Sequence, residues 1–142
     1  MLDSGPLGML AHPRPNTKAN EWLKRVAESG ARIVIPEIAD YEVRRELVRA
    51  GKTKGLRRLD RMKMTWGYLP IDTATMLQAA EFWAEARRSG KPTAPDTSLD
   101  ADVILAAQAK MMTVAGFHVT VATNNVDHLS RFVTALRLEQ FQ

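Results

Sequence analysis

The sequence of 142 residues contains no cysteine, few histidines and no long apolar run. Without cysteine the chain has no disulfides, no thiolate catalysis and no zinc site built on cysteine. No apolar stretch approaches the ~20 residues that a membrane-spanning helix needs, and the N-terminus lacks the pattern of a signal peptide. These absences predict a cytoplasmic protein with no membrane partner.

Composition and length predict one domain over residues 1–142. Apolar residues make up 45% of the chain and charged residues 25%, which is an ordinary globular mixture. The length suffices for a substantial core, and the sequence shows no internal repeat, low-complexity segment or linker. A net charge of +4 weakly favours an anionic partner, nucleic acid first, although many basic proteins bind none.

The stretch 99–109 organises the rest of the chain. Asp100 and Asp102 stand two residues apart, and no further charge follows until Lys110. A helix that is apolar on nearly every side is buried on nearly every side, so it carries both carboxylates inward. Buried carboxylates are costly unless they are paired, hydrogen-bonded or bound to metal. Taken alone, the pattern also fits Asp100 as an N-cap and Asp102 as a first-turn charge favoured by the helix dipole.

Periodicity and turn signals predict short strands that alternate with helices. The expected helices cover 17–29, 36–50, 52–64, 72–88 and 100–115, with one more near residue 127. The expected strands lie at 1–2, 32–35, 118–122 and 135–141, with 68–71 as a strand or an extended link. On helix 72–88 the residues predicted to face inward are Met76, Leu77, Ala80, Trp83 and Ala84. Such alternation is typical of a three-layer α/β/α fold with a short, mainly parallel central sheet.

Four acids are predicted to meet at the carboxyl ends of the strands, where parallel sheets bind ligands. Asp3 directly follows the first strand, and Glu42 lies one to two turns into the helix after the second. Asp100 and Asp102 head the helix that leads into a later strand. A cluster of Asp and Glu without His or Cys suits Mg²⁺ or Mn²⁺, because the carboxylates would otherwise repel one another.

The same residues resemble the PIN domain family, metal-dependent nucleases that include VapC-like toxins. The matching segments, which together span nearly the whole chain, are Leu2–Leu7, Tyr41–Val43, Asp102–Ala107 and Thr123–Asn125. The resemblance implies a PIN-like fold and a ribonuclease that hydrolyses phosphodiester bonds with Mg²⁺ or Mn²⁺. It further implies RNA as substrate, a role as the toxin of a toxin–antitoxin pair, and both an antitoxin and a second copy of the chain as partners.

By this resemblance Asp3, Glu42 and Asp102 correspond to the three most regular acids of the family and are the predicted catalytic residues. Asp3 and Asp102 are expected to bind metal directly or through water, and Glu42 to bind metal or orient the attacking water. Asn125 stands where the family often has a fourth acid, so the number of metals stays open. The candidates for that fourth place are Asn125, Asp100 and Asp127.

Other polar residues are candidates for contacts with substrate. Three of them are Ser4, Thr123 and Asn124. They are expected either to contact phosphate or metal-bound water, or only to stabilise the turns in which they lie. The basic segment 52–63 is either a solvated helix face or a surface that tracks a nucleic-acid backbone through Arg57, Arg58 and Arg61. The scattered histidines are expected to be structural or solvated: His12, His118 and His128.

Two functions besides the nuclease stay open on the sequence. One is a catalytically weak PIN-like module that binds nucleic acid, and the other is a module that binds an antitoxin or its own copy. Only two residues precede Asp3, whereas the first strand of such proteins is usually longer. Either this strand is short or the start of the protein lies upstream.

Overall fold

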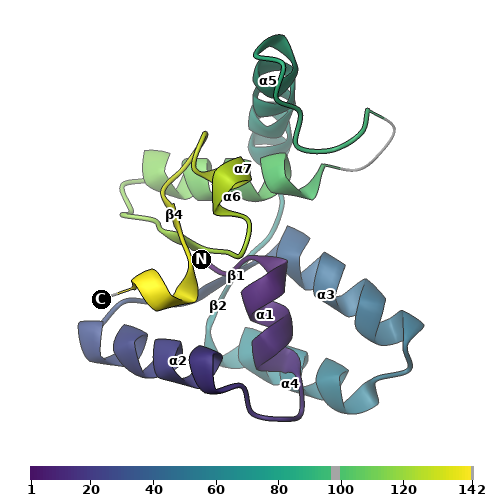
Figure 1. Cartoon of the computed structure of the whole chain (residues 1–142), viewed down its shortest axis with the longest axis vertical. Helices are drawn as coiled ribbons and strands as arrows, with labels where there is room; N and C mark the ends of the chain where they lie inside the picture. The colour runs from purple at the N-terminus through teal and green to yellow at the C-terminus, as the bar shows by residue number, and fades with distance from the viewer. Residues whose placement is uncertain (97–99, 142) are drawn as a thin grey trace.

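A computed structural model describes residues 1–96 and 100–141 of the chain. The helices are α1 (Ser4–Ala11), α2 (Thr17–Ser29), α3 (Glu37–Arg49), α4 (Thr53–Thr65), α5 (Thr73–Arg88), α6 (Ala101–Val114), α7 (Val126–Leu129) and the short 3₁₀ helix η1 (Leu138–Gln140) (Figure 1). The strands are β1 (Val34–Pro36), β2 (Gly67–Leu69), β3 (Val121–Ala122) and β4 (Ala135–Leu136). No helix in the described ranges is long and apolar enough to cross a membrane.

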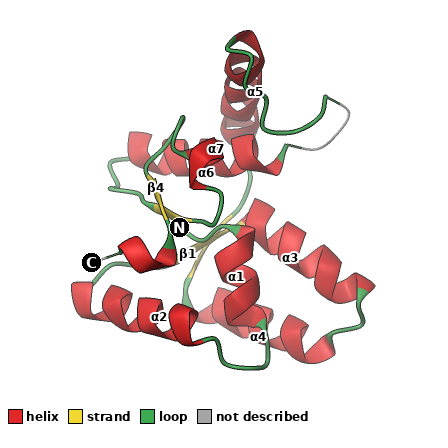
Figure 2. Ribbon diagram, in the orientation of Figure 1, coloured by secondary structure: helices red, strands yellow, loops and turns green. Residues whose placement is uncertain are grey.

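The strands are short and parallel, and the N-terminal residues join them into one layer (Figure 2). β1 pairs with β2, and β3 pairs with β4. Leu2 lies between the two pairs, because its N–H donates to the Val34 carbonyl at 3.0 Å and it forms a parallel bridge with Ala122. The order across the layer is therefore β2–β1–Leu2–β3–β4.

Apolar side chains form two cores, one on each side of this layer. Val121 belongs to the core built on α5 and α6, whereas its neighbour Ala122 belongs to the core built on α1, α2, α3 and α4. Alternate residues of a strand point to opposite faces, so the two cores lie on opposite faces of the sheet. The predicted fold class, helices around a short parallel sheet, is confirmed.

Sequence signals at the helix ends act as expected. The Asn16 side chain caps α2 by accepting the Ala19 N–H at 3.0 Å, and Gly30 ends this helix with a φ of 71°. The Asp100 side chain caps α6. The helix predicted over 17–29 is confirmed residue for residue, and the buried helix predicted from residue 100 begins one residue later. Leu99, where the organising stretch starts, lies outside the described residues.

The predicted inward face of α5 was wrong. Met76, Leu77 and Trp83 are 46%, 66% and 37% exposed; Ala80 is exposed and Ala84 half-buried. The buried stripe of α5, the helix that packs on α6, instead consists of Thr75, Ala79, Phe82 and Ala86. Two alanines in that stripe let the two helices approach closely. Because α5 carries apolar residues on two sides, periodicity alone did not identify the side that faces α6.

Helix α1 was not predicted, because Gly5 and Pro6 in its first turn are typical of a turn or loop. Asp3 caps this helix by accepting the Ser4 N–H at 2.6 Å. Pro6 falls in the first turn, where a backbone N–H has no partner within the helix, so its missing N–H costs little. The strands predicted over 118–122 and 135–141 are confirmed only at β3 and β4.

Candidate functional site

Three of the predicted acids meet at the carboxyl ends of the strands. Asp3 follows Leu2, Glu42 lies in the second turn of α3, and Asp102 lies in the first turn of α6. Burial raises the pKa of Glu42; the neighbouring Ser4 and Arg45 lower it, and the negative charges of Asp3 and Asp102 raise it. The three carboxylates therefore share one negative potential.

Asp3 is buried and held through both of its oxygens. Its Oδ1 accepts the Ser4 backbone N–H at 2.6 Å and the Ser4 hydroxyl at 3.3 Å. Its Oδ2 accepts the hydroxyl of the fully buried Thr123 at 2.6 Å. Thr123 Oγ1 in turn accepts the Asn125 N–H at 2.8 Å, which fixes the direction of the hydroxyl. The carboxylate therefore has one defined orientation.

Asp102 is bound by two residues of the segment that opens α7. Its Oδ2 lies 2.8 Å from Nδ1 of His128 and 2.8 Å from Nδ2 of Asn125. Burial raises the pKa of Asp102, the hydrogen bond from His128 lowers it, and the charge of Asp3 raises it again. Sequence reasoning missed this contact of His128. The available signal was its position three residues after Asn125, at the end of β3 where the acids converge.

Asp100 caps α6, and its negative charge also raises the pKa of Asp102. Asp100 is buried, and its carboxylate accepts the Val103 N–H at 3.4 Å and the Thr93 hydroxyl. Both oxygens of Asp100 therefore accept hydrogen bonds, as both oxygens of Asp3 do. Asp127 is exposed on α7. Among the three candidates for the fourth place, Asn125 is the one in contact with Asp102.

The residues predicted to contact substrate lie in two places. Asn124 is exposed beside the start of α1, where a Cβ on Gly5 would come within 2.7 Å of its Nδ2. Within the described residues, the basic trio of α4 (Arg57, Arg58 and Arg61) forms no salt bridge with Asp3, Glu42 or Asp102. A Cβ on Gly55 of α4 would lie 3.7 Å from the Ala11 carbonyl, at the end of α1 remote from Asp3. Eight helical residues, about 12 Å, separate the two ends.

Carboxylate oxygens that share a negative potential are the type of donor that hard divalent cations prefer. Among residues 1–96 and 100–141, no three His, Cys, Asp or Glu side chains lie close enough to hold one ion together. Mg²⁺ usually keeps several of its waters in protein sites. Residues Asp3, Glu42 and Asp102 would therefore hold such a cation partly through water.

Comparisons with known proteins place this geometry in context. Neither a protein-family model nor a curated protein matches the sequence. Solved structures do match: a chain of VapBC2 from Rickettsia felis bound to a promoter DNA fragment has a TM-score of 0.75 at 16% identity and covers 96% of each chain. A chain of FitAcB from Neisseria gonorrhoeae has a TM-score of 0.71 at 22% identity and covers 98% of this chain and 97% of its own. A chain of VapBC-1 from nontypeable Haemophilus influenzae has a TM-score of 0.70 at 17% identity and covers 99% and 98%. The fold is PIN-like.

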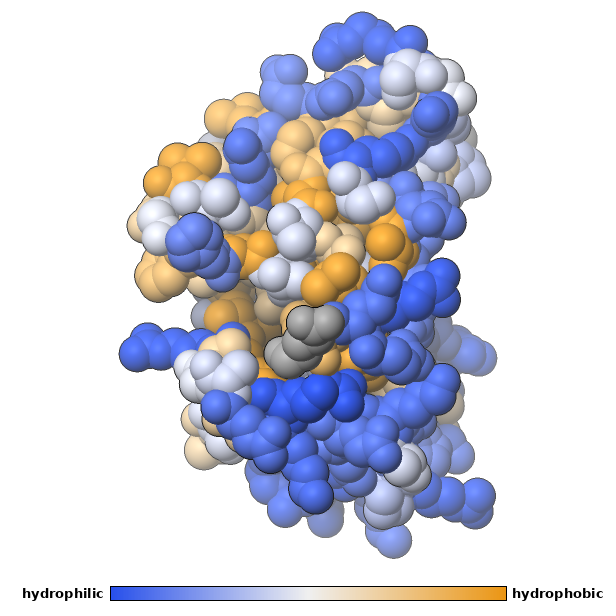
Figure 3. All heavy atoms as spheres, turned by 60° about the vertical axis from the view of Figure 1, so that its left-hand side comes forward, coloured by the Kyte–Doolittle hydropathy of each residue, from blue (hydrophilic) through white to orange (hydrophobic). Residues whose placement is uncertain are grey.

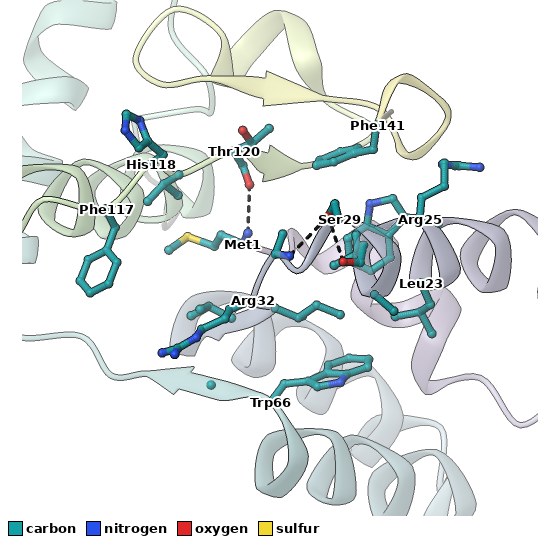
Figure 4. Close-up of a pocket in the computed structure, with 18 of the residues that line it drawn as sticks. Met1, Leu23, Arg25, Ser29, Arg32, Trp66, Phe117, His118, Thr120 and Phe141 are labelled. Carbon is teal, nitrogen blue, oxygen red and sulfur yellow. Dashed lines mark hydrogen bonds between the residues drawn. The ribbon is translucent and has the colours of Figure 1, made fainter.

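The PIN-like domain also contains an apolar cavity of about 1270 Å³ at the amino ends of the strands (Figure 4). Residues that line it include Met1, Trp22, Trp66, Phe117, Thr120 and Phe141. The Met1 amine donates to the Thr120 carbonyl at 2.9 Å, and burial lowers its pKa to about 6. Figure 3 shows apolar residues gathered across the middle of the face on the left of Figure 1, between a hydrophilic top and a hydrophilic lower part.

Proposed function

We propose that the protein is an endoribonuclease dependent on Mg²⁺ or Mn²⁺ and acts as the toxin of a toxin–antitoxin pair. The observation that carries the proposal is the meeting of Asp3, Glu42 and Asp102 in a PIN-like fold. Support for the toxin role comes from the solved neighbours, which are the FitAB and VapBC complexes.

The proposed chemistry is hydrolysis of a phosphodiester by water. A bound divalent cation lowers the pKa of a coordinated water and neutralises charge on the phosphoryl group. Ser4 and Thr123 hold Asp3 so that its oxygens face a fixed direction. Asn125 and His128 hold one oxygen of Asp102 in the same way. Glu42 would orient the attacking water. Fixed donors of this kind avoid reorganisation when charge develops in the transition state.

Cleavage of an end-labelled, mixed-sequence RNA tests the proposal. Wild-type protein should cleave with Mn²⁺ and not with EDTA. Asp102→Asn should lower the rate at least about a hundredfold, the upper end of the range for losing a group that supports a metal site. Asp127→Asn is the matched control, because Asp127 is an exposed acid on α7. Full activity in a folded Asp102→Asn protein would contradict the assignment.

We propose two partners, an antitoxin protein and a second copy of the chain. The outward face of α5 supports self-association, because Met76, Leu77 and Trp83 are exposed on one helix. A two-fold contact would cover such a face on both copies at once. Sedimentation velocity should show a dimer for the wild type and a monomer for Leu77→Glu. A wild-type monomer at high concentration would remove the second copy from the proposal.

One observation favours the second candidate function, a catalytically weak module that binds nucleic acid. The fourth position of the site holds the uncharged Asn125, whose amide is bonded to Asp102. Binding of RNA without cleavage in either metal would support this alternative. The logarithm of the RNA-binding constant should fall linearly with the logarithm of the salt concentration. If Arg57, Arg58 and Arg61 track the backbone, replacing all three by Ala should make that slope shallower by about 0.7 for each charge removed. An unchanged slope would leave α4 as a solvated face.

A further inference from the structure

An exposed aromatic side chain and an arginine lie at the rim of the acidic site. Tyr41 directly precedes Glu42 on α3, and its side chain is 48% exposed. The Arg45 guanidinium carbon lies 5.3 Å from the centroid of the Tyr41 ring. Nη2 of the same guanidinium lies 3.7 Å from Oε1 of Glu42. Arg45 therefore connects the ring of Tyr41 to the acidic cluster.

This pair lies on a different side of α3 from the basic helix α4. Arg44 faces α4, because its guanidinium is 2.7 Å from the Asp60 carboxylate and also binds Asp40. Successive helical residues are about 100° apart around the axis, so Arg45 points away from that contact. Arg45 pairs with no residue of another helix in the described ranges, only with acids of α3. The side chains of Tyr41 and Arg45 are 48% and 49% exposed, so a ligand at the site can reach both.

We infer that Tyr41 and Arg45 form a platform on which a nucleobase next to the cleaved phosphodiester stacks. The inference rests on the proposed ribonuclease function and specifies its substrate as RNA that is unpaired at the cleavage site. Proteins that bind single strands stack bases on aromatic rings and on guanidinium planes. A base that is paired in a helix cannot reach such a platform, because its faces are covered by neighbouring base pairs. Arg45 also supplies the positive charge that a phosphate beside three carboxylates needs.

Fluorescence anisotropy with a labelled 12-nucleotide oligoadenylate tests the platform. The Asp102→Asn protein serves as parent in every arm, so that the RNA stays intact. Adding Tyr41→Ala should weaken binding about fivefold to a hundredfold, the range for removing one base-stacking aromatic side chain. Tyr41→Phe keeps the ring and should restore the affinity of the parent. A duplex of the same length should bind equally to all three proteins.

Two matched variants control for general effects. Arg49→Ala removes another arginine of α3, which is exposed and paired with Glu46 at 2.6 Å. Phe117→Ala removes an exposed aromatic side chain just beyond the far end of α6. Neither should change the affinity for the single strand, whereas Arg45→Ala should weaken it.

The outcomes separate the platform from the nuclease proposal. If Tyr41→Ala binds the single strand as tightly as its parent, the platform is wrong and the exposed rim is left to a protein partner. Tighter binding of the duplex than of the single strand would also overturn it. If binding depends on Tyr41 but the otherwise wild-type protein cleaves no RNA, the platform stands and the nuclease fails.

Discussion

The acidic site and the apolar cavity occupy opposite ends of the same short strands and differ in how their polar atoms are satisfied. At the acidic end, each oxygen of Asp3 accepts a hydrogen bond and Asp102 is bound by two side chains. At the cavity end, the buried Trp22 Nε1 and Arg25 Nε have no hydrogen-bond partner within the described ranges. One end orients charged groups for chemistry, and the other is an apolar hollow next to two unused donors.

The largest expected effect is on the stability of the protein, at the wall of the cavity. Trp22 is 3% exposed and packs edge-on against Phe141, with ring centroids 5.9 Å apart. Trp22→Ala should therefore lower the free energy of unfolding by about 3–5 kcal/mol, measured by urea denaturation. Trp22→Phe should cost less, because it keeps an aromatic ring and removes the unpaired N–H.

Activity gives the matching control for that prediction. Cleavage per folded molecule should be unchanged in Trp22→Phe, since Trp22 lies at the end of the strands remote from the acids. Asp102→Asn should show the opposite pattern, with lost cleavage and nearly unchanged stability. If Trp22→Ala were as stable as the wild type, the cavity wall would not belong to the core.

The sequence predicted that Asp3, Glu42 and Asp102 would lie near one another, and the structure brings their charges together; their catalytic role stays a prediction. Asp3 and Asp102 stand at the ends of strand and helix signals, and parallel topology brings such ends together. The contact of His128 with Asp102 could not be predicted, because α7 has only four residues and its direction depends on packing. The prediction of which side of α5 is buried failed for a related reason, because apolar residues recur with helical spacing on two sides of this helix.

The cavity could not be predicted, because its lining has the composition of a core. Trp22, Leu23 and Val26 form the apolar side of α2, which is the pattern of a core-facing helix. Val26 and Trp22 are indeed buried, yet their helix also borders the hollow. Whether an apolar side is covered or left beside a cavity depends on the volume of distant residues such as Phe117, which a local pattern does not contain.

A smaller effect is expected when a negative charge is added to the acidic site at Asn125. Its amide brings no negative charge to the site, so Asn125→Asp should bind Mn²⁺ about tenfold more tightly, the lower end of the range for groups supporting a metal site. Isothermal titration calorimetry measures affinity and stoichiometry together. Asp127→Asn should bind as the wild type does. Equal affinity and stoichiometry in wild type and Asn125→Asp would mean that Asn125 only opens α7.

The smallest expected effect concerns the repulsion among the carboxylates. Burial, with added repulsion from Asp3 and Asp102, raises the pKa of Glu42. The Glu42 carboxyl therefore stays protonated to a higher pH in the folded protein than in the unfolded chain. The free energy of unfolding falls as the pH rises from the ordinary pKa of glutamate to the raised pKa of Glu42. In EDTA at pH 7, Glu42→Gln should thus be more stable than the wild type, within about 0.5 kcal/mol.

Two further measurements decide whether that gain reflects charge. Below pH ~4 the wild-type carboxyl is protonated in both states, so the advantage of Glu42→Gln should disappear. Glu46→Gln, one turn along α3 where Glu46 is exposed and paired with Arg49, should give no gain at either pH. Adding Mn²⁺ at pH 7 should reverse the order of stability, because a cation that binds only the folded state stabilises the protein with more carboxylates. A Glu42→Gln advantage that persisted in Mn²⁺ would mean that Glu42 contributes repulsion to the site without contributing to metal binding.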